Sequence, residues 1–255
     1  MYQVDLNCDL GESYGRYTLG MDEKIIPFIT SANIACGYHA SDPVVMSKTV
    51  AIAKSNQVQI GAHIGFPDLM GFGRRNMSIS YEEAKTYTQY QMGALLAFCQ
   101  AANQKLIHVK PHGAMYNMAA KDYQLAKAIC EGIYEIDPKI VLLGLSNSEM
   151  LKAAADMGLS YASEVFADRA YEEDGSLVAR TKPGAMIEEE ELAIERVVQM
   201  VKEGCVTAIS GKKIAIVADS VCIHGDSPKA LEFAKRIHKT LLEQGITLKP
   251  FSGRK

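Results

Sequence analysis

The chain has 255 residues, of which 48% are hydrophobic and 22% charged, so it can bury one large core. We therefore expect a single domain over residues 1–255. The formal net charge of −3 argues against a nucleic-acid surface, because phosphate binding normally requires a basic face. No apolar run is long enough to cross a membrane and the N-terminus has no apolar leader, which predicts a cytoplasmic protein without membrane contact.

Short apolar runs alternate with helical patterns in chain order. The runs that predict buried parallel strands are 4–8, 32–36, 58–64, 106–109, 140–144, 161–165 and 214–217. The predicted helices are 43–55 after a Ser41-Asp42 cap, 80–102 with a Ser80/Glu83 capping box, 147–157, a face over 194–201, and a last helix after Ser227-Pro228. Segment 206–213 predicts a hairpin arm and 246–249 a final strand.

The order of strand and helix, repeated about seven times, predicts a parallel α/β sheet. Such a sheet is either an open, doubly wound layer or a closed barrel. An open sheet gathers its polar residues near one switch point, whereas here nearly every predicted strand ends in a polar cluster. We therefore favour a closed, irregular (β/α) barrel of about seven strands.

Two connections are long enough to act as loops over a binding site. They cover residues 65–78 and 168–183 and both follow predicted strands. They therefore belong on the same face as the polar clusters, where we expect them to close over a substrate.

The first predicted strand carries Asp5, Asn7 and Asp9 at alternate positions, so all three point to one side. Three polar groups in line inside a barrel are costly unless they pair or bind something. Asp9 or the following Glu12 could instead cap the turn at Gly11, but the number of acids favours a functional site.

Histidines follow the second and third predicted strands. His39 and His63, together with Asp9, make a His-His-carboxylate set that would suit a metal ion. No HExxH or HxH spacing accompanies them, so we favour hydrogen-bonded substrate contacts and expect no resident metal.

Cationic groups lie at further strand ends. Lys110 precedes Pro111, where the chain must leave the sheet, and a lysine there can neutralise a developing oxyanion or a phosphate. Arg74 follows a glycine-rich turn that suits phosphate or carboxylate without matching a known phosphate motif. His224 and Asp226 come just before the last predicted helix, where free N–H groups also favour anions.

The same clusters carry a family resemblance. The segments are 5–12 (DLNCDLGE), 31–42 (SANIACGYHASD), 61–75 (GAHIGFPDLMGFGRR), 109–117 (VKPHGAMYN) and 221–226 (VCIHGD). In this order they resemble the LamB/YcsF family over essentially the whole chain. The resemblance implies a barrel akin to the glycoside hydrolase/deacetylase group. It also implies one subunit of an ATP-hydrolysing 5-oxoprolinase, which converts 5-oxo-L-proline, ATP and water to L-glutamate, ADP and phosphate with two partner subunits, B and C.

The resemblance and the chemistry together give predicted roles. The predicted catalytic residues are Asp9, Glu12, Lys110, His112 and His224, with Asp9 or Glu12 as general base and His112 or His224 as the acid for the ring nitrogen. The predicted substrate contacts are Asn7, Asn33, His39, His63, Arg74, Asp168, Arg169 and Asp226. Lys110 and Arg74 would hold phosphate or carboxylate, and ATP with its Mg²⁺ is the expected cofactor.

Two other functions stay open. A metal-dependent deacylase that acts without ATP would use the set of Asp9, His39 and His63. A non-catalytic subunit would only complete a complex, and the many polar strand ends argue against it.

Overall fold

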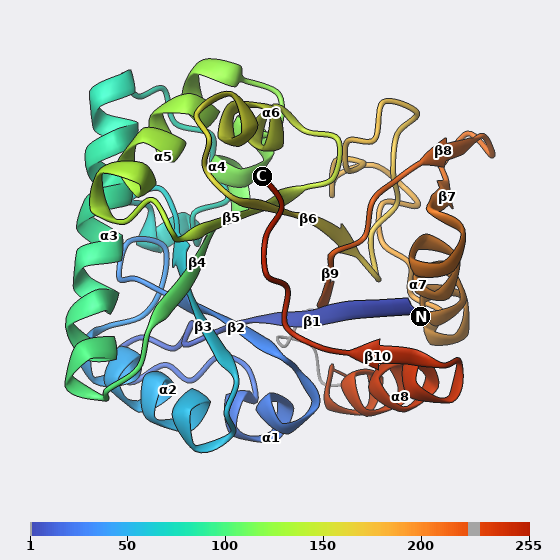
Figure 1. The fold of residues 1–255 in the computed structure, drawn as a ribbon, viewed down its shortest axis with the longest axis horizontal. Helices are drawn as coiled ribbons and strands as arrows, with labels where there is room; N and C mark the ends of the chain where they lie inside the picture. Colours follow the sequence, from blue (N-terminus) through green and yellow to red (C-terminus); the bar gives the residue numbers. More distant parts are fainter. Residues whose placement is uncertain (1, 224–229) are drawn as a thin grey trace.

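Seven parallel strands close into a barrel with helices packed around it (Figure 1). The structure, a computed structural model, describes residues 2–223 and 230–255. The barrel strands are β1 (Tyr2–Leu10), β2 (Ser31–Ala35), β3 (Gln59–Ile64), β4 (Leu106–Pro111), β5 (Val141–Leu145), β6 (Tyr161–Phe166) and β9 (Ser220–Ile223). Closure occurs at β1, where Asn7 pairs with Ser31 of β2 on one side and with Cys222 of β9 on the other. The predicted closed (β/α) barrel is confirmed.

Helices connect most of the strands and cover the outside of the barrel. They are α1 (Asp22–Ile25), α2 (Pro43–Ser55), α3 (Tyr81–Ala101), α4 (Gly113–Ala119), α5 (Tyr123–Ile136), α6 (Glu149–Asp156), α7 (Glu190–Glu203) and α8 (Ala230–Glu243), with short 3-10 turns η1 (Ile26–Phe28) and η2 (Leu69–Gly71). Two predicted start signals are confirmed: Asp42 accepts hydrogen bonds from two backbone N–H groups of α2, and Ser80 forms the capping box of α3. The predicted start at Ser227-Pro228 lies outside the described residues. The helices α4 and α5 occupy a stretch where none is predicted.

The seventh barrel strand is not the predicted one. The run 214–217 does not enter the barrel, because Lys213–Ala215 forms β8 and pairs antiparallel with β7 (Cys205–Thr207) in an outer hairpin. The strand that closes the barrel is β9, whose residues are all buried between β6 and β1. The hairpin arm itself is confirmed. A short apolar run flanked by exposed lysines is compatible with a strand of an outer hairpin and with a barrel strand. Only the pairing in the tertiary structure distinguishes the two.

The C-terminal tail closes the barrel at the end opposite the polar clusters. β10 (Ile246–Leu248) adds to the start of β1, in parallel with Tyr2–Val4, which confirms the predicted final strand. The tail then crosses to β6, where Arg254 pairs with Tyr161 (Figure 1). Phe251 packs on the way against Val141, Leu143 and Ala162.

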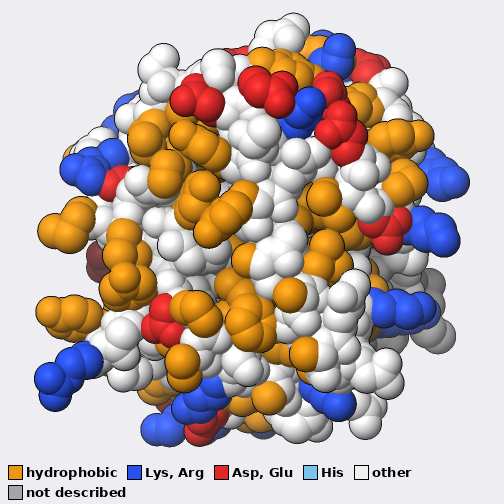
Figure 2. Space-filling model, turned by 90° about the vertical axis from the view of Figure 1, so that its left-hand side faces the viewer, with side chains coloured by type: hydrophobic (Ala, Val, Ile, Leu, Met, Phe, Trp, Pro, Cys, Tyr) orange, Lys and Arg blue, Asp and Glu red, His pale blue; other side chains and the backbone are white. Residues whose placement is uncertain are grey.

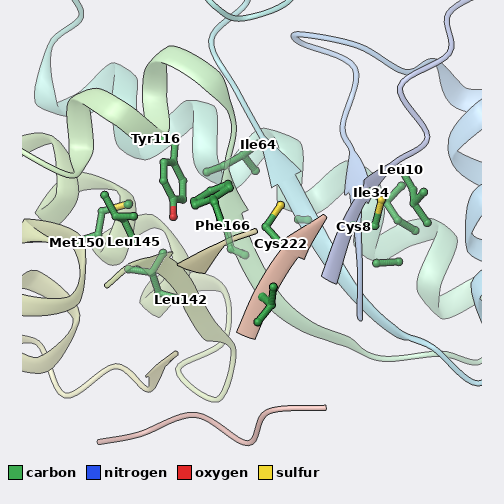
Figure 3. Close-up of a cluster of buried hydrophobic side chains, with 14 of the residues drawn as sticks. Cys8, Leu10, Ile34, Ile64, Tyr116, Leu142, Leu145, Met150, Phe166 and Cys222 are labelled. Carbon is green, nitrogen blue, oxygen red and sulfur yellow. The ribbon is translucent and has the colours of Figure 1, made fainter. Parts of the chain in front are cut away.

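Apolar side chains fill the space between the strands and the helices. Figure 3 shows part of this core, in which Tyr116 of α4 lies close to Phe166 and Cys222 at the ends of β6 and β9. The rings of Tyr116 and Phe166 meet edge to face with centroids 5.8 Å apart. The core therefore extends up to the strand ends that carry the polar clusters.

The outer surface mixes polar and apolar side chains. On the face in Figure 2, which is the side where α3 lies in Figure 1, hydrophobic side chains are scattered among polar ones. Exposed large hydrophobic residues include Tyr90 of α3 and Tyr134 of α5. None of the described helices has the length and apolar character that a membrane span requires.

Candidate functional site

A cavity of about 850 Å³ opens at the carboxyl ends of the barrel strands. Its floor is polar and includes Asp9, His63 and Lys110, from the ends of β1, β3 and β4. Its rim comes from both of the predicted long loops, through Arg74 in one and residues 176–181 in the other. The carboxyl ends of the strands are where barrel enzymes assemble their active sites.

Asp5 lies below the cavity and has a structural role in joining strands. Its carboxylate accepts hydrogen bonds of 2.6 Å from Thr30 Oγ1 and 2.6 Å from Ser31 Oγ, and one from Ser220 Oγ. Burial raises the pKa of this carboxyl from 3.8 to about 6, although these hydroxyls lower it in part. Asp5 thereby ties β1 to β2 and β9.

Asn7 and Asn33 form the next layer of the barrel interior, and both are fully buried. The Asn33 amide donates to Asn7 Oδ1 and to Asp9 Oδ1, in each case at 2.8 Å. Its own oxygen lies 2.7 Å from His108 Nε2. Neither asparagine is among the residues that line the cavity, and their contacts lie beneath Asp9; the substrate contacts predicted for them stay predictions.

Lys110 lies among carboxylates at the floor of the cavity. Its Nζ is 2.9 Å from Asp9 Oδ1, 2.8 Å from Glu164 Oε1 and 3.2 Å from Cys222 Sγ. Burial opposes its charge, but the neighbouring acids outweigh burial and hold the pKa of Lys110 well above its usual range. Lys110 is therefore a buried cation that fixes two carboxylates, and its predicted role as a holder of phosphate stays a prediction.

Asp9 joins this lysine to the histidines. One carboxylate oxygen bonds Lys110, and the other, Oδ2, lies 3.2 Å from His63 Nε2. The Asp9 side chain retains 13% exposure and contributes to the wall of the cavity. It is thus a carboxylate that Lys110 and Asn33 orient towards any ligand in the cavity.

Three histidines and Glu12 meet beside Asp9. The four side chains come from the ends of different strands or the loops after them: Glu12, His39, His63 and His112. One potential ligand atom from each lies within 4.8 Å of the others. Such a set can hold a metal ion. Its carboxylate is Glu12 rather than the predicted Asp9, and His112 joins the predicted His39 and His63.

Glycines make room for these imidazole rings. His39 and His112 stack with ring centroids 3.8 Å apart. A Cβ on Gly73 would lie 2.7 Å from His39 Cβ and 2.9 Å from His112 Cδ2, and Gly73 also has a φ of +62°. A Cβ on Gly65 would lie 2.7 Å from His39 Nδ1. The glycine-rich loop therefore serves to pack the histidines closely.

Arginines surround the opening of the cavity. Arg74, Arg169 and Arg180 line it, and Arg74 lies over the ring of Phe72 at 5.0 Å. Arg169 is nearly buried and donates to Val178 O at 2.7 Å, and burial lowers its pKa to about 10. Asp168 is not among the residues that line the cavity. The predicted substrate contacts Arg74 and Arg169 are thus at the cavity, where their guanidinium groups can meet a phosphate or a carboxylate.

Three buried residues of the site are missing from the predicted set: Tyr116, Glu164 and His108. Glu164 is fully buried against Lys110 and accepts a 2.7 Å hydrogen bond from Tyr116 Oη. His108 lies inside the barrel against Asn33, where burial lowers its pKa to about 3. The sequence could have indicated Glu164, because it is the acid of a predicted strand whose other residues are apolar or small.

The predicted His224 and Asp226 lie outside the described residues.

Comparison with known proteins places the chain in a family. The model of the LamB/YcsF family matches residues 4–255. The chain belongs to the LamB/YcsF family. Among relatives of this LamB/YcsF chain, a protein of Clostridium beijerinckii that is named as the A subunit of 5-oxoprolinase is 63% identical over 98% of both chains. One of the same name from Pyrococcus abyssi is 56% identical over 97% of both chains.

A solved structure is similar over nearly the full length. The lactam utilization protein from Thermus thermophilus has a TM-score of 0.93 and 42% identity, covering 98% of this chain and 100% of that one. The LamB/YcsF resemblance predicted from the sequence motifs is therefore confirmed.

Proposed function

We propose that this chain is the A subunit of an ATP-dependent 5-oxoprolinase and that its barrel hydrolyses the activated lactam of 5-oxo-L-proline. The observation that carries the proposal is the position of Asp9, a carboxylate held by Lys110 at the wall of a cavity, in a chain 63% identical to a relative named as that subunit. ATP with Mg²⁺ and two partner subunits, B and C, belong to the same proposal.

The substrate requires activation before water attacks it. Resonance between the ring nitrogen and the carbonyl makes an unstrained lactam a poor electrophile. Transfer of the γ-phosphoryl group of ATP to the amide oxygen releases ADP and turns that oxygen into part of a good leaving group. We assign this transfer to the complex with the partner subunits and the following steps to the barrel.

Asp9 is the proposed general base. Its Oδ1 is occupied by Lys110 and Asn33, so Oδ2 is the oxygen placed to accept a proton from water. The water adds to the phosphorylated carbon and gives a tetrahedral intermediate. Lys110 keeps its charge beside Asp9, so its ammonium stabilises the carboxylate that faces the cavity.

Opening of the ring then requires a proton on the departing nitrogen. Burial, and next the neighbouring His39, hold the pKa of His112 well below its usual range, so a neutral His112 is a poor acid. We propose that Asp9 passes on the proton that it took from water, with His224 as the second candidate. The C–N bond breaks to give γ-glutamyl phosphate, and a second water hydrolyses this mixed anhydride to L-glutamate and phosphate.

The arginines supply the binding charge. A phosphorylated oxoproline carries a phosphate and a carboxylate, and Arg74, Arg169 and Arg180 line the cavity that would receive it. Guanidinium groups bind both kinds of anion with paired hydrogen bonds. In this proposal the three arginines, rather than Lys110, hold the phosphate and the carboxylate of the substrate.

The first test is release of glutamate from 5-oxo-L-proline and ATP by this chain mixed with the B and C subunits, with each component left out in turn. We expect release only from the complete mixture. Release that continues without this chain would contradict the proposal.

The second test is Asp9→Asn in the same mixture. We expect turnover to fall by about 10²–10⁴-fold, the usual contribution of a general base, with unchanged far-ultraviolet circular dichroism. Asp156→Asn is the matched control, because Asp156 accepts a surface hydrogen bond from Tyr123 and does not line the cavity. Turnover of Asp9→Asn at the level of that control would contradict the assignment of the base.

A deacylase that acts without ATP is the rival function. The cluster of Glu12 and three histidines favours it, because a bound metal can activate water without phosphorylation of the substrate. Amide cleavage by this chain alone that persists without ATP and stops on chelation would establish this rival.

A further inference from the structure

Backbone carbonyls fix the tautomers of two histidines beside the cavity. His63 Nδ1 is 3.0 Å from Lys110 O, and His112 Nε2 is 2.8 Å from Phe72 O. A carbonyl oxygen only accepts hydrogen bonds, so both of these ring nitrogens must carry a proton. In each neutral ring the other nitrogen is then an unprotonated lone pair.

These two lone pairs face each other. His63 Nε2 and His112 Nδ1 are 3.0 Å apart, and each belongs to a buried ring. Two lone pairs at this distance repel unless a cation lies between or beside them.

His39 gives an independent sign of a missing ligand. It is fully buried, and neither of its ring nitrogens has a hydrogen-bond partner among the described residues. Buried polar atoms without partners are rare in folded proteins and call for an explanation. Its Nε2 lies 3.4 Å from Glu12 Oε1, so the ring points into the same cluster.

The separations within the cluster match a coordination shell. Zinc bonds of 2.0–2.1 Å in tetrahedral geometry place neighbouring donor atoms about 3.4 Å apart. Three of the six separations are 3.0 Å from His63 Nε2 to His112 Nδ1, 3.4 Å from His39 Nε2 to Glu12 Oε1 and 3.6 Å from His112 Nδ1 to Glu12 Oε1, and all six are within 4.8 Å. The cluster is thus already close to the size that one ion requires.

We propose that Glu12, His39, His63 and His112 bind one divalent first-row transition-metal ion, with Zn²⁺ as the best match. Three imidazoles and one carboxylate are typical ligands for such an ion. The carbonyls of Lys110 and Phe72 are the outer partners that orient two of the rings. Mg²⁺ prefers oxygen ligands and water, so this site is separate from the Mg²⁺ that accompanies ATP.

This inference is independent of the proposed function. It concerns binding of a metal by the chain itself, whichever reaction the barrel hosts. Its test therefore needs neither substrate nor partner subunits, and its failure would leave the oxoprolinase proposal untouched.

The test begins with the full chain freed of metal by chelation and shown by circular dichroism to be folded. Calorimetric titration with Zn²⁺ is expected to give about one ion per chain, while Mg²⁺ at the same concentration gives no saturable heat. Loading with Co²⁺ is expected to give the visible absorption of a four-coordinate ion. Absence of saturable binding of Zn²⁺ by the folded chain would overturn the inference.

Variants locate the ion. His39→Gln and His63→Gln are each expected to weaken the binding of Zn²⁺ by more than about 10-fold, because each removes a ligand. His238→Gln is the matched control, since His238 bonds Phe28 O on the outside of the barrel. Binding that both ligand variants retain at full strength would overturn the assignment.

A spectroscopic measurement covers the case in which a variant does not fold. In the wild-type chain labelled with ¹⁵N at histidine, Zn²⁺ is expected to shift the signals of His39, His63 and His112 and to leave those of His108 and His238 in place. A metal-free spectrum with a doubly protonated His63, unchanged by Zn²⁺, would show that a proton holds the cluster together and would overturn the inference.

Discussion

At the scale of single residues, the barrel interior is organised by buried charges. Lys110, exposed by only 2%, neutralises Asp9 and Glu164, and Tyr116 adds a hydrogen bond to Glu164. Each of these groups would be costly alone in an apolar interior. The arrangement therefore makes the site dependent on Lys110 for stability as well as for chemistry.

Lys110→Met is expected to destabilise the chain, because it leaves two acids without their cation. We expect a loss of roughly 3–5 kcal/mol in the free energy of unfolding, measured by urea titration. The double variant Lys110→Met/Glu164→Gln should recover part of the loss. Equal stability of Lys110→Met and the wild type would contradict this account.

The raised pKa of Asp5 predicts that the stability of the chain depends on pH. Its pKa is about 6 in the folded chain against 3.8 ordinarily, so the folded state binds the extra proton and stability falls as the pH rises through this window. The difference corresponds to roughly 3 kcal/mol. Asp5→Asn cannot ionise, so its unfolding free energy should lose that part of the slope between about pH 4 and pH 6. Parallel curves for variant and wild type would show that Asp5 does not titrate as stated.

At the scale of elements, the parallel strands bring side chains from distant sequence into layers. Asn33 of β2 pairs with Gly61 of β3, and Gly61 pairs with His108 of β4. The absence of a side chain at Gly61 is what admits the His108 ring to the barrel, since a Cβ there would lie 2.0 Å from its Nε2. The absence of a side chain at Gly61 on β3 thus allows β4 to place the His108 ring inside the barrel.

Gly61→Ala is accordingly expected to destabilise the barrel by at least about 1–3 kcal/mol, the usual cost of overpacking. Gly93→Ala on α3 is the matched control, because its Cβ would meet nothing within 4 Å and alanine favours a helix. Thermal unfolding should therefore move in opposite directions for the two variants. A neutral Gly61→Ala would mean that His108 leaves the interior at little cost.

At the scale of the whole molecule, the first strand and the C-terminal tail pack together at the end of the barrel opposite the site. β10 lies beside the first residues of β1, and the tail after it carries Phe251 across the barrel end to the ring of His108, with centroids 5.2 Å apart. Arg254 then pairs with Asp219. The tail therefore supports the layer that lies beneath Asn33 and Asp9.

Phe251→Ala is expected to lower the free energy of unfolding by roughly 3–5 kcal/mol, as for other buried aromatic residues replaced by alanine. Lys255→Ala, at the exposed end of the same tail, should change it by less than about 0.5 kcal/mol. Urea titration of both variants measures the difference. Similar midpoints for the two would show that the tail does not support the barrel.

The sequence by itself determined the closed parallel barrel, most strand positions, the caps of α2 and α3 and the strand ends that carry the site. These follow from local pattern: apolar runs, capping residues and polar residues where a strand stops. The motifs also sufficed for the family. The seventh barrel strand was predicted at 214–217 instead of β9, because a short apolar run does not reveal its pairing partner.

Only the tertiary structure decided which polar groups satisfy one another. The sequence alone is compatible with Lys110 facing an anion and with Asn33 facing a substrate. In the closed barrel, carboxylates lie beside Lys110 and His108 lies beside Asn33. His112 likewise joined the histidine cluster through loop packing around Gly73, and Glu12 joined it from the loop after β1, in neither case through sequence spacing. The physical reason is that burial forces each polar atom to find its partner in space, and such partners can lie far apart in the chain, as Asn7 and Ser220 do at a separation of 213 residues.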